Sequence, residues 1–417
     1  MKILFLTENF PPETNAAATR VFERALYWVK DGHQVTVVTS APNFPQGKLH
    51  EGWKNRWHQV EDREGIRVVR VKTYIAANRG TARRTADFVS FMITACVAGL
   101  FEKRPDVIVA TSPQFFAAVG GWLLGAIRRT PFVFELGDLW PASIVAVGAM
   151  KPSLALRAME KLELFLYRRS SAVVALTQAF KNNLVNRGIE PEKIAVVING
   201  VDLWRYAPQE RDGDLATQWQ LEGKFVLGYV GTHGMAHALS NILDAAELLR
   251  DRTDICFMLA GDGAERDMLI TRAGSQGLEN IVFIPPQPKE MMPKIWSLCD
   301  IALVHLKDTP AFSEVIPSKM FEAMGMGLPV LMALPKGEAS AILEYEKAGL
   351  HIAPEDPRAL ADAAIQLCDD KKRRATLAKN SLAAAPGHSR ETQAEQMISV
   401  LEAAAQGRGM TVGGAKQ

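Results

Sequence analysis

Short apolar strand patterns alternate with helical patterns along this chain, and this alternation limits the folds that are open to it. The first half holds such strand patterns, rich in β-branched residues, at residues 2–7, 33–40, 66–71, 106–111, 131–136 and 172–176. They lack polar alternation, which is expected of strands that helices cover on both faces of a parallel sheet. The pattern therefore favours a doubly wound α/β fold over a mixed antiparallel sheet.

A second series of the same kind follows in the second half. Its strand patterns lie at residues 225–231, 255–261, 281–285, 301–306 and 328–334. The 417 residues of the chain are too many for one ordinary core and enough for two. Ligands of open α/β sheets bind beyond the carboxyl ends of the strands, so two facing sheets would share a cleft. We therefore predict two facing Rossmann-like doubly wound domains with an inter-domain cleft.

The domain boundaries follow from the composition between the two series. Turn-forming and charged residues predominate from 201 to 222, which predicts a linker. The chain then divides into an N-terminal and a C-terminal domain, followed by a helix that packs back on the first domain and by a frayed tail. The predicted ranges are 1–200, 223–385, 386–406 and 407–417 respectively.

Composition and charge exclude several classes of protein. A net charge of +2 argues against nucleic-acid binding by the chain as a whole. The four cysteines lie in apolar stretches without a CxxC pair, as expected of reduced residues in a cytosolic protein. The first ten residues resemble a strand and not a signal peptide. The longest apolar runs, at 88–101 and 115–127, are shorter than the ~20 residues that a spanning helix needs.

The segment FSEVIPSKMFEAMGMGLPV carries the strongest chemical signal. Glu314 lies in a loop after a strand, Pro317 suits the first turn of a helix, and Glu322 falls on that helix. Free amides at a helix start bind anions, so a diphosphate could sit there. The residues concerned are Ile316, Pro317, Ser318 and Lys319.

The same segment offers two carboxylates and a cation for a donor substrate. Glu322 can accept hydrogen bonds from the two hydroxyls of a ribose. Glu314 would lie on the sugar side of the diphosphate, and Lys319 could add positive charge near the leaving group. The alternative is that Lys319 and Glu322, three residues apart on a helix, form a surface pair of only ~0.2–0.5 kcal/mol.

This segment resembles the E-x7-E signature of the retaining glycosyltransferases with the GT-B fold that are numbered family 4. Three other stretches resemble that family, at residues 196–206, 228–249 and 255–269, so that the likeness covers nearly the whole chain. Three shorter stretches, NFPPE, PNFPQG and ELGDLWPAS, resemble a bacterial surface-polysaccharide subgroup of the O-antigen and colanic-acid type. That subgroup adds fucosyl or N-acetylfucosaminyl units to lipid-linked oligosaccharides.

The resemblance implies roles for the two glutamates, namely ribose binding for Glu322 and donor contact for Glu314. The family's glycine loop usually carries an Arg and a Lys that neutralise the diphosphate, but this chain has Thr232 and His237 there. Diphosphate binding would then depend on the amides of Gly231 and Thr232, on the segment from Pro317 to Lys319, and on a protonated His237. The alternative is a glycine turn needed only for close strand-to-helix packing.

On the acceptor side, the resemblance points to the loop after the strand at 131–136. Asp138 is the candidate base for the acceptor hydroxyl, provided that it lies within hydrogen-bond reach. Asp138 could instead cap a following helix, for which aspartate is a preferred residue. Glu135, inside the strand pattern, is the alternative acid.

The reaction expected from the resemblance is transfer with retention, from a nucleotide sugar that we take to be UDP-linked. The transferred sugar would be a hexose or an N-acetylhexosamine, such as the N-acetylated deoxyhexosamine N-acetylfucosamine, and the acceptor a polyprenyl-diphosphate-linked sugar. No DxD run follows a strand, which favours a metal-independent enzyme with no cofactor besides its donor substrate. GDG at 261–263 is better explained as a turn.

Residues 67–84 contain six basic residues and no acid, and the apolar run at 88–101 follows directly. Such a combination suits an anionic membrane surface. We therefore expect residues 67–101 to hold the protein at the inner face of the cytoplasmic membrane, with residues 151–170 as a second candidate. For both stretches the alternative is a helix packed on its own sheet with solvated arginines.

Two other functions remain open at the level of sequence. A nucleotide-sugar 2-epimerase would use a similar two-domain architecture and would need no acceptor. A non-catalytic nucleotide-sugar-binding protein would bind without turnover, which the replaced Arg and Lys of the glycine loop would suit. A dinucleotide oxidoreductase is disfavoured, because neither first strand is followed by GxGxxG with an acid about twenty residues on.

Overall fold

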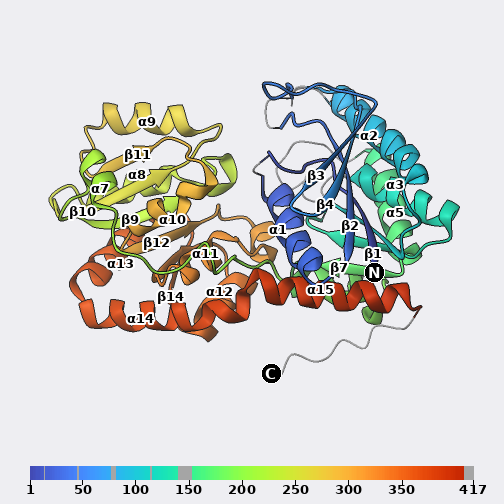
Figure 1. Cartoon of the computed structure of the whole chain (residues 1–417). Coiled ribbons are helices and arrows are strands. Elements are labelled where there is room, and N and C mark those ends of the chain that lie inside the picture. Colours follow the sequence, from blue (N-terminus) through green and yellow to red (C-terminus); the bar gives the residue numbers. More distant parts are fainter. Residues whose placement is uncertain (14, 45–46, 77–80, 113–114, 140–152, 408–417) are drawn as a thin grey trace. The chain divides into compact units, whose positions relative to one another are not determined.

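The computed structural model describes residues 1–13, 15–44, 47–76, 81–112, 115–139 and 153–407 (Figure 1). The chain forms two compact units. The first comprises Met1–Ile198 together with Glu391–Gln417, and the second comprises Asn199–Arg390. Each unit has a sheet of its own.

The sheet of the first unit has eight strands in the order β3-β4-β2-β1-β5-β6-β7-β8. Neighbouring strands are parallel except β3 and β4, which pair antiparallel at one edge. The six predicted strands are present, and β3 and β8 are additional. The bounds are β1 (Lys2–Leu6), β2 (Gln34–Ser40), β3 (His58–Arg63), β4 (Ile66–Val71), β5 (Val107–Thr111), β6 (Phe132–Leu136), β7 (Ala172–Ala175) and β8 (Ile194–Val196).

Helices cover both faces of this sheet. Along β1, Leu4 and Leu6 pack into the core beneath one set of helices, whereas Ile3 and Phe5 pack into the core on the opposite face. The first set is α2 (Thr81–Phe101), α3 (Phe115–Arg128) and α5 (Leu154–Arg169); the second is α1 (Ala16–Lys30) and α15 (Arg390–Ala405); α6 (Gln178–Asn186) follows β7. The strands are thus buried on both sides, as their uninterrupted apolar sequences predict.

The C-terminal helix α15 completes the core of the first unit. Met397 and Leu401 are fully buried among residues of β1, β2 and α1. The indole Nε1 of Trp28 on α1 donates a hydrogen bond of 3.0 Å to the carbonyl of Ala394. The last helix therefore packs against the first one, at the opposite end of the sequence.

The second unit has a six-stranded parallel sheet in the order β11-β10-β9-β12-β13-β14. Its strands are β9 (Phe225–Val230), β10 (Ile255–Ala260), β11 (Ile281–Ile284), β12 (Ile301–His305), β13 (Val330–Ala333) and β14 (Gly349–Ile352). Its helices are α7 (Gly213–Gln218), α8 (Ser240–Leu248), α9 (Arg266–Ser275), α10 (Met292–Ser297), α11 (Lys319–Gly325), α12 (Glu338–Glu346), α13 (Pro357–Asp369) and α14 (Lys371–Ala384). Residues 201–222, assigned above to a linker, belong to this unit and contain α7.

The two ends of the second unit run side by side. The amide of Val201 donates to the carbonyl of His388 at 2.9 Å, and the amide of Arg390 donates to the carbonyl of Val201 at 2.8 Å. The guanidinium of Arg390 also donates to Asn199 Oδ1 at 2.6 Å. The chain therefore enters and leaves this unit at one place.

In the second sheet, β9 lies between β10 and β12, so the chain continues to one side of β9 and later crosses to the other. Such a switch point leaves the loops after the flanking strands free to diverge, and ligands of open α/β sheets bind there. The loop after β9 starts at Gly231, and the segment after β12 leads to α11. Both hold residues predicted to bind the donor.

Candidate functional site

The loop after β9 packs closely against the turn after β10. Gly231 has a φ of +146°, a conformation that favours glycine. A Cβ added at Gly261 would lie 2.0 Å from the Gly231 carbonyl oxygen, and one at Gly263 would lie 2.3 Å from the His233 carbonyl oxygen. The glycines of GDG thus have a packing role, and they bring the start of α9 against the glycine loop.

Lys319, the first residue of α11, reaches this loop from the other side. Its Nζ lies 3.6 Å from the ring centroid of Tyr229, and a Cβ added at Gly231 would lie 2.9 Å from it. The nitrogen is buried and has no hydrogen-bond partner among the described residues. Burial lowers the pKa of Lys319 to about 7, although the carboxylate of Glu322 acts in the opposite direction. Lys319 Nζ makes no hydrogen bond to Glu322 and is buried, unlike the exposed pair considered above.

The rings of His237 and His305 each contact the backbone carbonyl of the other residue. His305 Nδ1 lies 2.8 Å from the carbonyl oxygen of His237, and His237 Nδ1 lies 3.3 Å from that of His305. Burial, followed by the charge of Lys319, lowers the pKa of His237 to about 4. The ring is therefore neutral near pH 7 in the unliganded protein, and a protonated His237 would require a bound anion.

The two glutamates lie on either side of the start of α11. Glu314 ends a short 3₁₀ helix (Pro310–Glu314), and burial raises the pKa of its carboxyl group. Glu322 Oε2 accepts a hydrogen bond of 3.2 Å from the indole of Trp296. The helix begins at Lys319, so the predicted anion-binding residues Ile316, Pro317 and Ser318 precede it.

The segment with Glu314 is held by the helix that follows the next strand. A Cβ added at Gly337, the N-cap of α12, would lie 1.9 Å from the carbonyl oxygen of Ser313. Only a glycine permits this contact. At the glycine loop, the Thr232 side chain is exposed while its carbonyl accepts a hydrogen bond of 2.8 Å from the hydroxyl of Tyr229.

The predicted acceptor residues lie in the first unit, at the carboxyl end of β6. The amide of Asp138 donates to Ser112 Oγ at 3.3 Å, and its side chain is half-buried. The helix that Asp138 could cap would lie in residues 140–152, outside the described residues. Glu135 is fully buried and pairs with Arg24 at 2.5 Å and with Arg20 at 3.2 Å.

The pairing of Glu135 indicates a structural role. Burial alone would raise the pKa of Glu135, but the charges of Arg24 and Arg20 outweigh it and lower the pKa to about 2. A carboxylate with such a low pKa is a poor proton acceptor near neutral pH. Asp138 thus remains the better candidate for the acceptor side.

Two basic residues near the glycine loop were not found from the sequence. His233 is fully buried within the loop itself, and Arg266 is the first residue of α9. Arg266 belongs to a stretch whose likeness to the family was noted above, and His233 lies between the two residues singled out in the loop. Their positions beside Lys319 depend on how β9, β10 and β12 are paired.

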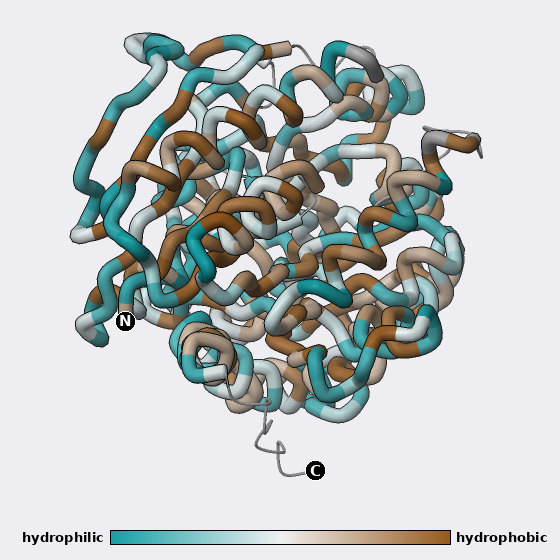
Figure 2. The backbone as a smooth tube through the Cα atoms, turned by 90° about the vertical axis from the view of Figure 1, so that its right-hand side faces the viewer, coloured by the Kyte–Doolittle hydropathy of each residue, from teal (hydrophilic) through white to brown (hydrophobic). Residues whose placement is uncertain are grey.

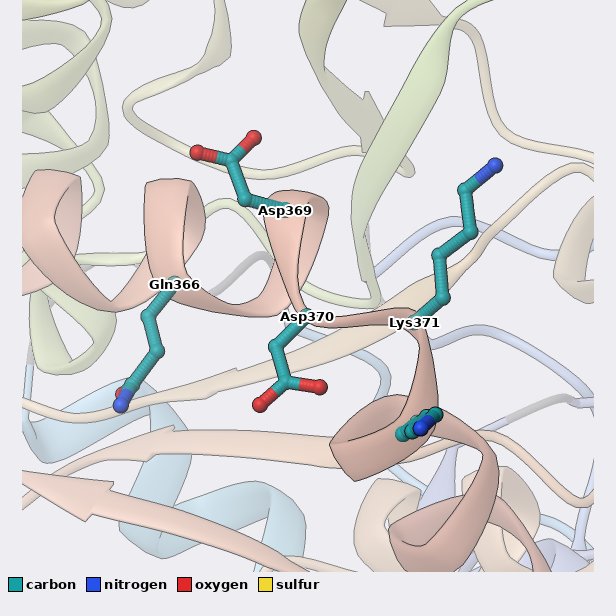
Figure 3. Close-up of a pocket in the computed structure, with 5 residues that line it drawn as sticks. Gln366, Asp369, Asp370 and Lys371 are labelled. Atoms are coloured by element: carbon teal, nitrogen blue, oxygen red, sulfur yellow. The ribbon is translucent and has the colours of Figure 1, made fainter.

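A pocket elsewhere in the described part of the chain holds no comparable cluster. A shallow pocket lies where α13 meets α14, lined by Gln366, Asp369, Asp370, Lys371 and Lys372, whose labelled side chains point in different directions (Figure 3). Asp369 there is paired with Arg252. Among the described residues, no group of His, Cys, Asp and Glu side chains could hold a metal ion.

The basic stretch predicted to meet a membrane is partly internal. Arg70 is buried and pairs with Glu61 at 2.8 Å, and Arg67 pairs with Glu102 at 2.8 Å. Arg79 lies outside the described residues. Residues 83–101 of α2 are long and apolar enough to cross a membrane by length and composition alone, and a third of that segment is buried inside the structure.

Comparison with known proteins identifies the family. Residues 15–200 match the family described as glycosyl transferase 4-like domain, and residues 215–383 match glycosyl transferases group 1. A putative colanic acid biosynthesis glycosyl transferase of Escherichia coli, WcaI, is 25% identical over 78% of this chain and 82% of that protein. A GDP-mannose-dependent alpha-mannosyltransferase of Mycobacterium tuberculosis is 24% identical over 92% of each chain.

The fold also has solved counterparts. The crystal structure of Anabaena HepE in complex with UDP superposes with a TM-score of 0.71, at 21% identity, over 97% of this chain and all of that one. This likeness shows the two-domain GT-B architecture of parallel, Rossmann-like sheets. With one family matched by most of the first unit and a second by most of the second, the chain belongs to the glycosyltransferases of the GT-B fold.

Proposed function

We propose that this glycosyltransferase moves a sugar from a UDP-linked donor to a lipid-linked sugar acceptor, with retention of configuration, in the synthesis of a bacterial surface polysaccharide. One observation carries the donor half: Lys319 Nζ lies against the glycine loop at Gly231, on the same helix as Glu322. The complex of HepE with UDP and the resemblance to WcaI support the nucleotide and the pathway class.

The donor would use two residues of the first turn of α11 differently. Its diphosphate would meet the amides of Gly231 and Thr232 and the amine of Lys319, while the ribose would hydrogen-bond to Glu322. A cation beside the departing diphosphate stabilises the charge that develops in the transition state. Glu314, in the segment ahead of the helix, would face the transferred sugar.

The first unit would hold the acceptor. Asp138, half-buried after β6, is proposed to hold the acceptor hydroxyl, with the leaving diphosphate taking part in proton removal. The transferred sugar is proposed to be an N-acetylhexosamine of the N-acetylfucosamine type. The reaction is proposed to need no metal ion, since the described basic side chains would neutralise the diphosphate.

An exposed apolar surface of the first unit is proposed to rest on the membrane that holds the acceptor. On α2 it comprises Ile93, Val97, Leu100 and Phe101, and on α3 Leu123 and Ile127. Lys103, Arg104 and Arg129 are exposed beside it. Figure 2 shows apolar stretches along the helices on the side that faces the viewer. We call these six apolar residues the α2–α3 surface; basic residues next to such a surface favour anionic lipids, at the cytoplasmic face.

A donor screen tests the proposed reaction. The full chain would be incubated with UDP- and GDP-sugars, with and without a short-chain polyprenyl-diphosphate sugar, and released nucleotide and glycosylated lipid would be measured. We expect nucleotide release from a UDP-sugar that depends on the acceptor. Release with conversion of the donor and without an acceptor would indicate the epimerase, and binding without turnover would indicate the non-catalytic protein.

Glu322→Gln tests the donor site directly. Removing the charged acceptor of two ribose hydrogen bonds is expected to lower kcat/KM for the donor by about 100-fold. Glu344→Gln, an exposed change on α12, is the matched control and should keep wild-type rates. Equal rates in both variants would contradict the assignment of Glu322.

A further inference from the structure

Three basic side chains from three different segments meet at the glycine loop. His233 belongs to the loop, Arg266 begins α9 and Lys319 begins α11. The backbone joins them closely, because the amide of His233 donates to the carbonyl of Asp262 at 2.8 Å and the amide of Glu265 donates to the carbonyl of His233 at 2.9 Å. Arg266 therefore follows directly after a residue bonded to the loop.

All three side chains have buried nitrogens without a hydrogen-bond partner among the described residues. These are both ring nitrogens of His233, Nε of Arg266 and Nζ of Lys319. Buried polar groups are nearly always satisfied, and each exception costs free energy. Several unsatisfied donors around one glycine loop are the arrangement expected of a site that receives an anion.

The lowered pKa values of His233 and Lys319 reduce the positive charge of the cluster at neutral pH. Burial, then the charges of Arg266 and Lys319, lower the pKa of His233 to about 4, while Asp262 opposes this shift. Lys319, with a pKa of about 7, is only half protonated at neutral pH. Arg266 adds a guanidinium to the cluster, whose planar fork of donors suits phosphate oxygens.

Among the described residues, no other titratable side chain hydrogen-bonds to the buried nitrogens of this cluster. His237 and His305 have pKa values of about 4, and Tyr229 has a raised pKa because it is buried, so all three are neutral at pH 7. Glu322 acts on Lys319 and Glu355 acts on His305, in both cases through space. The positive charge of the cluster is therefore not neutralised by a directly bonded carboxylate, and a bound anion would be stabilised there.

We propose that Arg266 and Lys319 bind the diphosphate of the donor, that Arg266 replaces the charge missing from the glycine loop, and that Lys319 and His233 take up protons as the diphosphate binds. This inference rests on the proposed function. Arg266 and Lys319 are half-buried and would touch the phosphate oxygens. His233 is fully covered and is a positioning residue, whose charge follows that of the site.

Binding of UDP and of uridine to the full chain, measured by calorimetry, separates the phosphate contacts from those of the nucleoside. Arg266→Gln is expected to weaken UDP binding by ~10- to 100-fold and to leave uridine binding unchanged. Arg266→Lys, which keeps a positive charge, should recover part of the affinity. Arg272→Gln is the matched control on the same helix, since Arg272 pairs with Asp244 and should not affect UDP.

The proton uptake is measured by repeating the titration with UDP in two buffers of different ionisation enthalpy, above the pH at which the nucleotide itself ionises. The wild type should take up protons, and UDP affinity should fall as the pH rises above 7, because a proton must be added to Lys319 before it can pair with the diphosphate. Lys319→Met should remove most of this uptake. His233→Gln should reduce it and leave uridine affinity unchanged.

The outcomes separate this inference from the proposed function. If the wild type binds neither UDP nor GDP, the proposed donor is wrong. If it binds UDP, but Arg266→Gln binds equally well or binding releases no buffer-dependent heat, the nucleotide site stands and the inference is overturned. Unfolding curves for each variant exclude a loss caused by misfolding.

Discussion

Lys319 and Glu322 lie three residues apart on α11 and meet different surroundings. The amine is buried against Tyr229 and has no hydrogen-bond partner among the described residues, whereas the carboxylate accepts a hydrogen bond from the indole of Trp296. The sequence pattern predicted both as donor-binding residues. Their proposed division of labour, an amine at the glycine loop and an anchored carboxylate for the ribose, depends on contacts with Tyr229 of β9 and Trp296 of α10.

Asp87, on the first turns of α2, gives a prediction about pH and stability. Its Oδ1 is buried without a partner among the described residues, and burial raises its pKa to about 6 although Ala76 and Arg84 act in the opposite direction. The folded protein therefore binds this proton more tightly than the unfolded chain, and stability is lost as the pH rises from about 4 to 6. Asp87→Asn should raise the free energy of unfolding at pH 8 by about 1–2 kcal/mol.

Urea denaturation at pH 8 and at pH 4 measures this effect. The gain should be much smaller at pH 4, where the aspartate is protonated in the folded protein and about half protonated in the unfolded chain. Asp31→Asn, at an exposed position after α1, should change stability at neither pH. A loss of stability in Asp87→Asn at pH 8 would contradict this prediction. It would mean that attraction between Asp87 and Arg84 outweighs the cost of burying the charged carboxylate.

The role of Glu135 could not be predicted from the sequence. Its place in an apolar strand pattern predicted burial, but left open whether it acts as an acid. The answer comes from Arg24 on α1, 111 residues earlier, and from Arg20 on the same helix. Ion pairs between a strand and a distant helix leave no pattern in a single sequence. For the same reason the sequence did not predict that His233 and Arg266 lie beside Lys319.

At the scale of elements, α2 combines the length of a spanning helix with the contacts of a core helix. A Cβ added at Gly99 would lie 2.4 Å from Leu124 Cδ2, so α2 and α3 approach closely. Arg128 Nη1 donates to the carbonyls of Gly99, Leu100 and Glu102 at 2.6, 3.1 and 2.9 Å and so satisfies the end of α2. A helix held by these contacts can present its outer apolar face to a membrane surface while it stays packed on α3.

The α2–α3 surface leads to a prediction about membrane binding. Phe101→Asp combined with Ile127→Asp should lower the amount of protein that sediments with phosphatidylglycerol vesicles by ~10-fold, because two exposed apolar side chains no longer enter the interface. Turnover of a water-soluble acceptor analogue should be unchanged.

The control introduces an aspartate at an exposed apolar residue outside the α2–α3 surface. Leu248 on α8 is 47% exposed, and Leu248→Asp should leave sedimentation unaltered. Vesicles of phosphatidylcholine alone should bind the wild type weakly, since they offer no anionic charge to Lys103, Arg104 and Arg129. Equal sedimentation of the double variant and the wild type would contradict a role of this surface.

The elements themselves were largely predictable. The apolar strand patterns and their carboxyl-terminal loops were found, because burial on both faces leaves an uninterrupted signal. The short or half-exposed strands β3, β8 and β14 were not, because their burial gives no comparable run. The start of α11 lies two residues later than Pro317 suggested, a shift that is ordinary for helix ends.

At the scale of the whole molecule, the two units have separate hydrophobic cores, so we expect two unfolding transitions that respond to different changes. UDP at about 100 times its dissociation constant should stabilise the second unit by about 2.7 kcal/mol and raise the midpoint of one calorimetric transition. Met397→Ala, which opens space in the core of the first unit, should cost about 2–5 kcal/mol and lower the other transition.

Gln396→Ala is the control for the second change, because Gln396 is exposed beside Met397 on α15. It should leave both transitions in place. A single transition that shifts equally with UDP and with Met397→Ala would show that the two cores unfold together.

The position of α15 also bears on how the protein is made. The first unit is missing part of its core until the ribosome has synthesised the residues after Arg390, whereas all of the second unit has by then been translated. The half of the chain that is made first is therefore expected to complete its folding last. During synthesis, Trp28 and its neighbours on α1 must wait for a helix encoded at the far end of the message, which exposes an apolar surface that chaperones could bind in the meantime.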